Sequence, residues 1–227
     1  MRVDGRRPDQ LREISFKRGF VKNSLGSVLS VCGNTEVICT VNIKKGLPAW
    51  KESGSGGWLT AEYRMLPGST HTRNKREDKA GGRSSEIQRL IGRSLRAAVD
   101  LQKLGDLTIQ IDCDVMNADG GTRCASINGA MAALYEAIKN FDGDLDEAII
   151  KSPVAAISAG VIKGELLLDL CYLEDSNAEV DMNVIMNGDG AFVELQGTGE
   201  EGVFSREQLN DLIDSAYSGI KDILSKF

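Results

Sequence analysis

The chain has 227 residues, a length that suits one large domain or two small subdomains with a shared interface. Its single histidine, His71, excludes histidine-rich zinc sites, and the sequence has no G-x-S-x-G nucleophile motif to partner it. Carboxylates, cations and the backbone must therefore carry any reaction. The net charge is −6, yet residues 64–96 hold nine Lys or Arg against three Asp or Glu. This local excess indicates either a surface for a polyanion or a solvated basic loop.

The first part of the chain alternates short apolar runs with turns. Strands are predicted at residues 14–20, 27–31, 35–43 and 58–63, and their close succession favours an antiparallel meander. Residues 66–82 follow without a helical or strand period, which is typical of a functional or disordered loop. Within this loop, His71 is interpreted as a residue that hydrogen-bonds the loop, in preference to a general base.

A helix is predicted at residues 85–99, with its apolar residues on one face. Arg89, Arg93 and Arg96 recur on the opposite face. This arginine face could meet RNA or a neighbouring subunit. The alternative is a solvated face with Glu86 pairing to Arg89, or a structural ion-pair network.

A glycine-rich turn joins a predicted strand at 107–115 to a predicted helix at 122–140. Two glycines, Gly120 and Gly121, allow the backbone to approach a ligand closely, and the first amides of a helix have no intrahelical partner. Thr122 and Arg123 add a hydroxyl and a forked cation at the same point. The turn therefore favours phosphate binding, with a purely structural turn as the alternative.

The second half of the chain also alternates short apolar runs with turns. Strands are predicted at residues 154–161, 165–170, 182–186 and 192–196. A last helix is predicted to begin at Ser205, because Gln208 three residues on completes a capping box. Together these elements predict an α+β fold of two packed βα layers.

Four carboxylates lie within residues 174–181: Glu174, Asp175, Glu179 and Asp181. Such a set of hard oxygens suits Mg²⁺ or Mn²⁺. On a straight strand, Asp175 and Asp181 would lie ~20 Å apart, too far for one ion. Joint action therefore requires a bend around residues 176–177, and an exposed acidic turn is the alternative.

A phosphate site, a basic loop and a carboxylate set are the parts of metal-assisted phosphoryl chemistry on a nucleic acid. The chain resembles the ribonuclease PH family, phosphate-dependent 3′ exoribonucleases that trim tRNA precursors. The shared motifs run in order through nearly the full length: Arg2, Gly5 and Arg6, then GWLTAEY at 57–63, STHTRN at 69–74, GGR at 81–83, EIQRLI at 86–91, DCDV at 112–115, DGGTR at 119–123, EDS at 174–176, DMNV at 181–184 and QGT at 196–198.

The resemblance implies roles for particular residues. It implies that phosphate is held by Arg83, Gly121, Thr122 and Arg123. It implies that Asp175 and Asp181 hold a divalent metal, Mg²⁺ or Mn²⁺, and act in catalysis with Arg83 and Arg123. Arg73 and Arg76 match basic-loop positions associated with tRNA binding and subunit contacts.

The resemblance also implies a fold, a reaction and an assembly. The fold is of the ribosomal protein S5 domain 2-like kind, as a single catalytic domain over residues 1–227 with a core subdomain at about 10–140 and a second subdomain at about 153–227. Inorganic phosphate is the co-substrate that releases nucleoside diphosphates from RNA 3′ ends, and the reverse reaction adds nucleotides. The expected assembly is a homohexamer, a trimer of dimers.

Two positions depart from the family pattern. Gly68 stands where many members carry an arginine, so we expect the loop to bind tRNA more weakly. Cys124 replaces a more usual threonine and is interpreted as a packed small side chain, with an oxidation-prone thiol of lowered pKa as the alternative.

The sequence leaves two other functions open. One is a non-catalytic RNA-binding ring subunit of an exosome-like assembly, although such subunits typically lack the phosphate or metal residues. The other is a hydrolytic exonuclease that uses the carboxylates alone.

The cysteines and the N-terminus suggest a cellular compartment. The five cysteines are odd in number, lack C-x-x-C spacing and lie mostly in apolar runs, as buried thiols of a reducing compartment do. The sequence contains no apolar stretch near 18 residues and no signal-peptide core in its first residues. We expect a soluble, cytoplasmic protein with no membrane partner.

Overall fold

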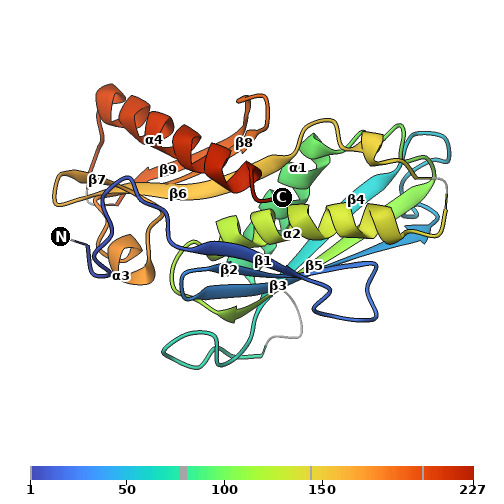
Figure 1. Cartoon of the computed structure of the whole chain (residues 1–227), viewed down its shortest axis with the longest axis horizontal. Coiled ribbons are helices and arrows are strands. Elements are labelled where there is room, and N and C mark those ends of the chain that lie inside the picture. Colours follow the sequence, from blue (N-terminus) through green and yellow to red (C-terminus); the bar gives the residue numbers. More distant parts are fainter. Residues whose placement is uncertain (1, 77–80, 144, 201) are drawn as a thin grey trace.

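The computed structural model describes residues 2–76, 81–143, 145–200 and 202–227. They form two β-sheets covered by helices, the α+β fold that was predicted (Figure 1). The strands are β1 (Ile14–Arg18), β2 (Gly26–Cys32), β3 (Thr35–Lys45), β4 (Trp58–Met65), β5 (Leu107–Asn117), β6 (Val154–Ile162), β7 (Glu165–Leu168), β8 (Val180–Asn187) and β9 (Phe192–Gly199). The helices are α1 (Gly82–Ala98), α2 (Thr122–Asn140), the 3₁₀ turn η1 (Glu147–Ile149), α3 (Tyr172–Asp175) and α4 (Arg206–Leu224).

The five-stranded sheet has the strand order β1-β2-β3-β5-β4. Strands β1, β2 and β3 form the expected antiparallel meander, but the prediction that residues 58–63 continue it is wrong. Strand β4 lies at the edge and pairs in parallel with β5, which is inserted between β3 and β4. Parallel neighbours need a crossover connection, and α1 supplies it between β4 and β5.

The helices divide the structure into layers. Helices α1 and α2 lie on one face of the five-stranded sheet, so residues of β3 alternate between buried and half-buried. In the other sheet, of order β7-β6-β8-β9, strand β6 is buried along nearly its whole length because α4 covers one face and α2 the other (Figure 1). The side chain of Asn128 in α2 exchanges two hydrogen bonds with the backbone of Ala156, which joins the layers.

Local signals in the sequence account for several element ends. Helix α2 spans the predicted residues, and α4 begins with the predicted capping box between Ser205 and Gln208. Strand β7 ends at Leu168, two residues before the prediction, because Asp169 adopts a left-handed φ of 56° that a strand cannot continue.

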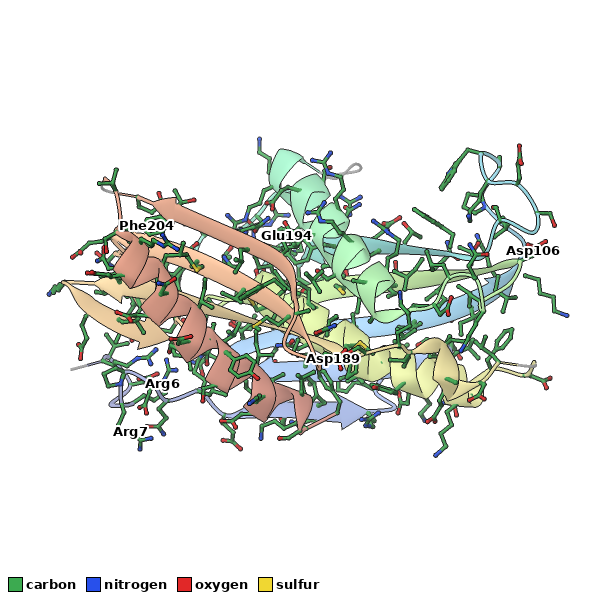
Figure 2. The ribbon with its side chains drawn as sticks, turned by 90° about the horizontal axis from the view of Figure 1, so that it is seen from above. Arg6, Arg7, Asp106, Asp189, Glu194 and Phe204 are labelled. Atoms are coloured by element: carbon green, nitrogen blue, oxygen red, sulfur yellow. The ribbon has the colours of Figure 1, made fainter. Side chains whose placement is uncertain are left out.

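Two of the three arginines on the polar face of α1 contact strands of the protein. Arg93 forms an ion pair with Glu194 of β9, with Nε to Oε2 at 2.5 Å. Figure 2 shows Glu194 beside the α1 helix. Arg96 lies 4.7 Å from the centre of the Trp58 ring and donates to the carbonyl of Leu59. The ion-pair interpretation is therefore confirmed for Arg93.

Among the described residues, no helix combines the length and the apolar character that a membrane crossing requires.

Candidate functional site

The glycine turn between β5 and α2 has the backbone that the sequence predicted. Gly120 and Gly121 have φ angles of 76° and 65°, in the left-handed region that favours glycine. A Cβ on Gly120 would lie 2.6 Å from the backbone carbon of Cys171, so the turn contacts the segment that leads into α3. Gly121 precedes α2 and supplies no side-chain cap, which leaves the first turn of the helix for an anion.

A pocket of about 730 Å³ opens in front of this turn. That volume lies in the range of small-molecule sites and exceeds what one small anion needs. Six of the eight predicted site residues line it: Arg83, Gly121, Thr122, Arg123, Asp175 and Asp181. The other two, Arg73 and Arg76, are exposed on the neighbouring loop, whose residues 77–80 lie outside the described part of the chain.

Two arginines and two helix beginnings give the pocket its positive side. Arg83 is the second residue of α1, and Arg123 is the second residue of α2. The N-terminus of a helix carries partial positive charge, so each arginine adds to a favourable site for an anion. Their positions thus fit binding of a phosphate group between the two helix beginnings.

Two side chains that were not predicted to belong to the site, Gln196 and Glu86, contact Arg123. Its Nη1 donates to Gln196 Oε1 at 2.8 Å, and Glu86 Oε1 lies 3.9 Å away. The amide nitrogen of Gln196 in turn donates to Glu86. Glu86 was expected to pair with Arg89, but it contacts Gln196 and Arg123 instead. The family motif at 196–198 was the only signal for Gln196.

The hydroxyl of Thr122 lies 2.9 Å from that of Tyr63, a buried residue of β4. Burial raises the pKa of Tyr63, so the phenol stays protonated and can donate. This contact holds the first residue of α2 against the sheet.

Asp175 and Asp181 line the same pocket because the chain bends between them. Helix α3 ends at Asp175, Ser176 follows as its C-cap, and β8 begins at Val180. The bend required at residues 176–177 is therefore confirmed. The four carboxylates do not act as one group, however, because Glu174 is buried and accepts two hydrogen bonds from Arg2, at 2.8 and 2.7 Å.

The surroundings of Asp175 and Asp181 fit a bound cation. Burial, followed by repulsion from Asp175, raises the pKa of Asp181 to about 6. Burial also raises the pKa of Asp175, against the opposing effect of Arg83 and Arg123. The Oδ1 atom of Asp181 is buried without a hydrogen-bond partner in the described part of the chain. An orphaned carboxylate oxygen beside a second carboxylate fits a divalent metal.

The protein supplies few ligands for such a metal. The described ranges contain no group of three or more His, Cys, Asp or Glu that could hold a metal ion. Mg²⁺ commonly binds through one or two carboxylates and completes its shell with water and substrate phosphates, so a pair is sufficient for it. Glu200 also lines the pocket and repels both aspartates; the sequence analysis missed it.

Cys124 is a packed thiol. It is buried, and its Sγ donates to Asn183 Oδ1 at 3.3 Å. Burial raises the pKa of Cys124 to about 12, in spite of the neighbouring Arg123, so the alternative of a lowered pKa is wrong. All five cysteines are buried free thiols, as predicted.

His71 lies on the wall of the pocket. It is exposed, and its ring centre is 6.0 Å from that of Tyr172. The contact that the structure shows is thus between rings, whereas the sequence analysis expected a loop hydrogen bond.

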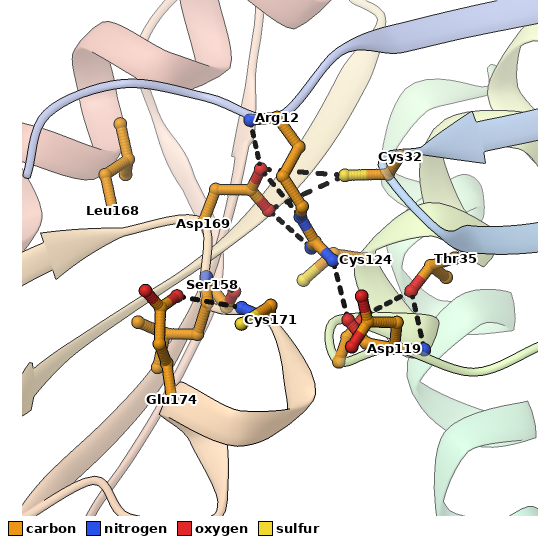
Figure 3. A network of polar contacts seen from close by, with 12 residues as sticks. Arg12, Cys32, Thr35, Asp119, Cys124, Ser158, Leu168, Asp169, Cys171 and Glu174 are labelled. Carbon is orange, nitrogen blue, oxygen red and sulfur yellow. Dashed lines mark hydrogen bonds and ion pairs between the residues drawn. The ribbon is translucent and has the colours of Figure 1, made fainter. Parts of the chain in front are cut away.

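A buried network connects the N-terminal segment to both sides of the pocket (Figure 3). Arg12 pairs with Asp169, with Nη2 to Oδ1 at 2.6 Å, and its Nη1 donates to the carbonyl of Asp119 at 2.7 Å. Although burial opposes the shift, Arg12 lowers the pKa of Asp169. The Oδ1 atom of Asp119 accepts from the backbone N–H of Tyr172. Nothing in the spacing of these residues revealed the network, because its members are far apart in the chain.

The pocket therefore combines a positive side, formed by two arginines and two helix beginnings, with a carboxylate side, formed by two aspartates whose pKa is raised. The positive side fits a free phosphate ion, and the carboxylate side fits a metal that contacts a second phosphate. Such a site can bring two phosphates together by offsetting their repulsion.

The chain is similar to known proteins over nearly its full length. The model of the 3′ exoribonuclease family, domain 1, matches residues 10–139, and domain 2 of the same family matches residues 152–219. The chain is 54% identical to ribonuclease PH of Corynebacterium glutamicum (strain R) over 229 residues, which cover 99% of this chain and 94% of that protein. It is also 54% identical to ribonuclease PH of Bacillus pumilus over 232 residues, with 100% and 96% covered.

Solved structures share the fold at low identity. An exosome of Archaeoglobus fulgidus with RNA bound to the active site matches with a TM-score of 0.86 at 22% identity, covering 100% of this chain and 92% of that one. Rice (Oryza sativa) Rrp46 matches with a TM-score of 0.81, also at 22% identity, with 99% and 97% covered.

Proposed function

Because the chain belongs to the ribonuclease PH family of 3′ exoribonucleases, we propose that the pocket between α2 and α3 is where it trims the 3′ end of tRNA precursors. The protein is a phosphorolytic 3′ exoribonuclease that uses inorganic phosphate as its co-substrate. The observation that carries the choice of site is that Arg83 and Arg123 line the same pocket as Asp175 and Asp181.

Phosphate binds at the beginning of α2 in this proposal. The backbone of Gly121 and Thr122 contacts the ion, and the guanidinium groups of Arg83 and Arg123 offset its charge. Gln196 orients Arg123 through the bond at 2.8 Å, so the forked side chain needs little reorganisation when the ion binds.

The reaction is an in-line displacement at the last phosphodiester of the RNA. An oxygen of the bound phosphate forms a bond to the phosphorus, and the bond from phosphorus to the 3′ oxygen of the preceding nucleotide breaks. The products are a nucleoside diphosphate and an RNA shortened by one nucleotide. Since the same transition state serves both directions, the enzyme also adds nucleotides from diphosphates.

Asp175 and Asp181 would hold Mg²⁺ or Mn²⁺, which supplies positive charge to the scissile phosphate when it is bound. The raised pKa of Asp181 and its orphaned Oδ1 atom support this assignment. Below about pH 6 the carboxyl of Asp181 holds a proton, and a metal must displace that proton to bind.

Arg73 and Arg76 bind the body of the RNA. Both are exposed next to the loop residues that line the pocket, such as His71 and Asn74, so a strand leaving the pocket passes them. Their charges contact phosphates and add affinity without sequence preference.

Two further properties belong to the proposal. We expect the chain to form a homohexamer, a trimer of dimers, because the family does. We place it in the cytoplasm, since five buried free thiols suit a reducing compartment.

A single assay tests the function against its rivals. Purified protein is incubated with 3′-extended tRNA and Mg²⁺, with and without phosphate, and the released nucleotides are identified. Diphosphates that appear only with phosphate support the proposal. Monophosphates without phosphate indicate a hydrolytic exonuclease, and RNA binding without any product indicates a scaffold subunit.

A further inference from the structure

Two aromatic rings stand at the edge of the phosphate pocket without a role in the proposed chemistry. Tyr172 is the first residue of α3 and is 46% exposed, an unusual position for a large aromatic side chain. The ring of His71 lies 6.0 Å from it, with 51° between the ring planes. Both line the pocket that contains the two arginines and the two aspartates.

A second hollow, of about 740 Å³, begins on the other side of these rings. It shares His71, Ala118 and Tyr172 with the phosphate pocket. The two rings thus stand between the hollows, and a ligand too long for the first would pass them as it enters the second. Leu173, which is 57% exposed, adds apolar surface to the second hollow.

The position of Tyr172 is fixed relative to both reacting groups. Its backbone N–H donates to Asp119 Oδ1 at 3.2 Å, in the turn that contacts the phosphate. It lies three residues before Asp175, on the same side of one helical turn. The backbone of Tyr172 is therefore fixed between the glycine turn and Asp175, while its side chain remains partly exposed.

We propose that Tyr172, with His71 beside it, is a stacking surface for a nucleobase of the RNA next to the scissile phosphodiester. The inference rests on the proposed function, since it takes RNA as the occupant of the pocket. Every base has a flat π face, so an aromatic ring orders the end of the strand whatever its sequence. This explains how a trimming enzyme can align successive nucleotides without reading them.

Three variants at one position isolate the ring. Tyr172→Ala removes it, Tyr172→Phe keeps the π face without the hydroxyl, and Tyr172→Leu keeps apolar bulk without the π face. RNA affinity is measured without phosphate by fluorescence anisotropy of a short labelled oligonucleotide. We expect a 5- to 150-fold weaker Kd for the Ala variant, the range that base stacking on aromatic residues gives, about 1–3 kcal/mol. The Phe variant should bind like the unchanged protein, and the Leu variant like the Ala variant.

Removing the base and the ring, singly and together, shows whether the two stack on each other. Oligonucleotides with one abasic residue, at the last or at the preceding position, are compared with the intact strand on the unchanged protein and on Tyr172→Ala. If the ring stacks on that base, removing either partner weakens binding and removing both adds little. The position at which this coupling appears identifies the stacked nucleotide. The KM for phosphate should not change, because Tyr172 does not contact the phosphate site in this proposal.

The proposal is overturned if the abasic residue and Tyr172→Ala weaken binding independently at both positions. It is also overturned if Tyr172→Leu binds as well as Tyr172→Phe. These measurements need no turnover, so they are separate from the test of the reaction. A preparation that releases diphosphates only with phosphate, yet shows no coupling, rejects the stacking surface and leaves the proposed function intact.

Discussion

The carboxylate of Asp119 accepts a hydrogen bond from the backbone N–H of Tyr172 at 3.2 Å. Asp119 immediately precedes the two glycines of the phosphate turn, and Tyr172 begins the short helix that ends at Asp175. One side chain thus joins the turn that is proposed to hold phosphate to the helix that is proposed to hold the metal. The backbone carbonyl of Asp119 also accepts from Arg12, which places the turn against the buried pair of Arg12 and Asp169.

Replacing Asp119 should therefore disturb catalysis more than folding. Asp119→Ala loses hydrogen bonds at a partly exposed site, which costs about 1–2 kcal/mol of unfolding free energy. A displacement of about 1 Å between reacting groups lowers rates by about 100-fold, so kcat should fall by about 10- to 100-fold. Asp9→Ala is the control, because Asp9 pairs with Arg7 at the exposed surface. An Asp119→Ala variant with the kcat of the control would contradict the positioning role.

Arg123→Ala should raise the KM for phosphate and lower kcat while the Kd for RNA changes little. The lost charge-assisted contact corresponds to about 1.5–3 kcal/mol, or about 10- to 150-fold in kcat/KM for phosphate. Arg123→Lys should recover only part of the loss, since an ammonium cannot form the forked contact. Arg89→Ala is the control on α1, because Arg89 is exposed and does not line the pocket. Unchanged phosphate dependence in Arg123→Ala would reject its role.

Asp181→Asn should abolish activity and change how stability depends on pH. The pKa of Asp181 is raised from its ordinary value of 3.8 to about 6, so the folded protein keeps a proton that the unfolded chain releases. This favours folding below about pH 4 and is lost as the pH rises through 6. Relative to Asp181→Asn, the unchanged protein should thus lose on the order of 2 kcal/mol of unfolding free energy between pH 4 and 7.

Added Mg²⁺ offers a second measurement at the same residue. A metal that binds the ionised carboxylates stabilises the folded protein, so Mg²⁺ should raise the Tm of the unchanged protein at pH 7.5 and less so at pH 5. The Asn variant should show no such rise. An equal rise in both proteins would place the metal elsewhere.

Breaking the pair of Arg12 and Asp169 should lower stability strongly. Both side chains are almost fully buried, at 5% and 2% exposure, and removing one partner leaves the other charge buried and unpaired. Asp169→Ala should cost about 3–5 kcal/mol in urea unfolding at pH 7, whereas Asp9→Ala should cost at most about 1 kcal/mol. Since the pKa of Asp169 is lowered, the contribution of the pair should be present at neutral pH and decline as the pH falls below about 4. A cost near that of Asp9→Ala would show that the network contributes little.

Arg76→Ala should weaken RNA binding without changing the chemistry. One fewer phosphate contact lowers affinity and reduces the slope of log Kd against log salt by about 0.7–1. The KM for phosphate should stay the same. The test is a set of RNA titrations at several salt concentrations, with Arg7→Ala as an exposed control outside the pocket lining. An unchanged slope would remove Arg76 from the RNA surface.

Local sequence signals predicted much of the fold. The bounds of α2 and the start of α4 follow from caps and hydrophobic period, which act between neighbouring residues. The place of β4 at the sheet edge did not follow, because strand order depends on a crossover through α1 that no local pattern encodes. Hydrophobic period likewise could not reveal α3, which has only four residues.

The candidate site divides in the same way. The sequence by itself determined its chemical groups: a glycine turn before a helix, two arginines and two aspartates separated by turn-forming residues. Only the tertiary structure decided which groups meet, by burying Glu174 against Arg2, by holding Arg123 with Gln196 and by placing Tyr172 beside His71. The physical reason is how far apart in the chain the interacting residues lie. Caps and turns depend on residues a few positions apart, whereas desolvation and charge pairing in the pocket depend on segments that meet only when both sheets have formed.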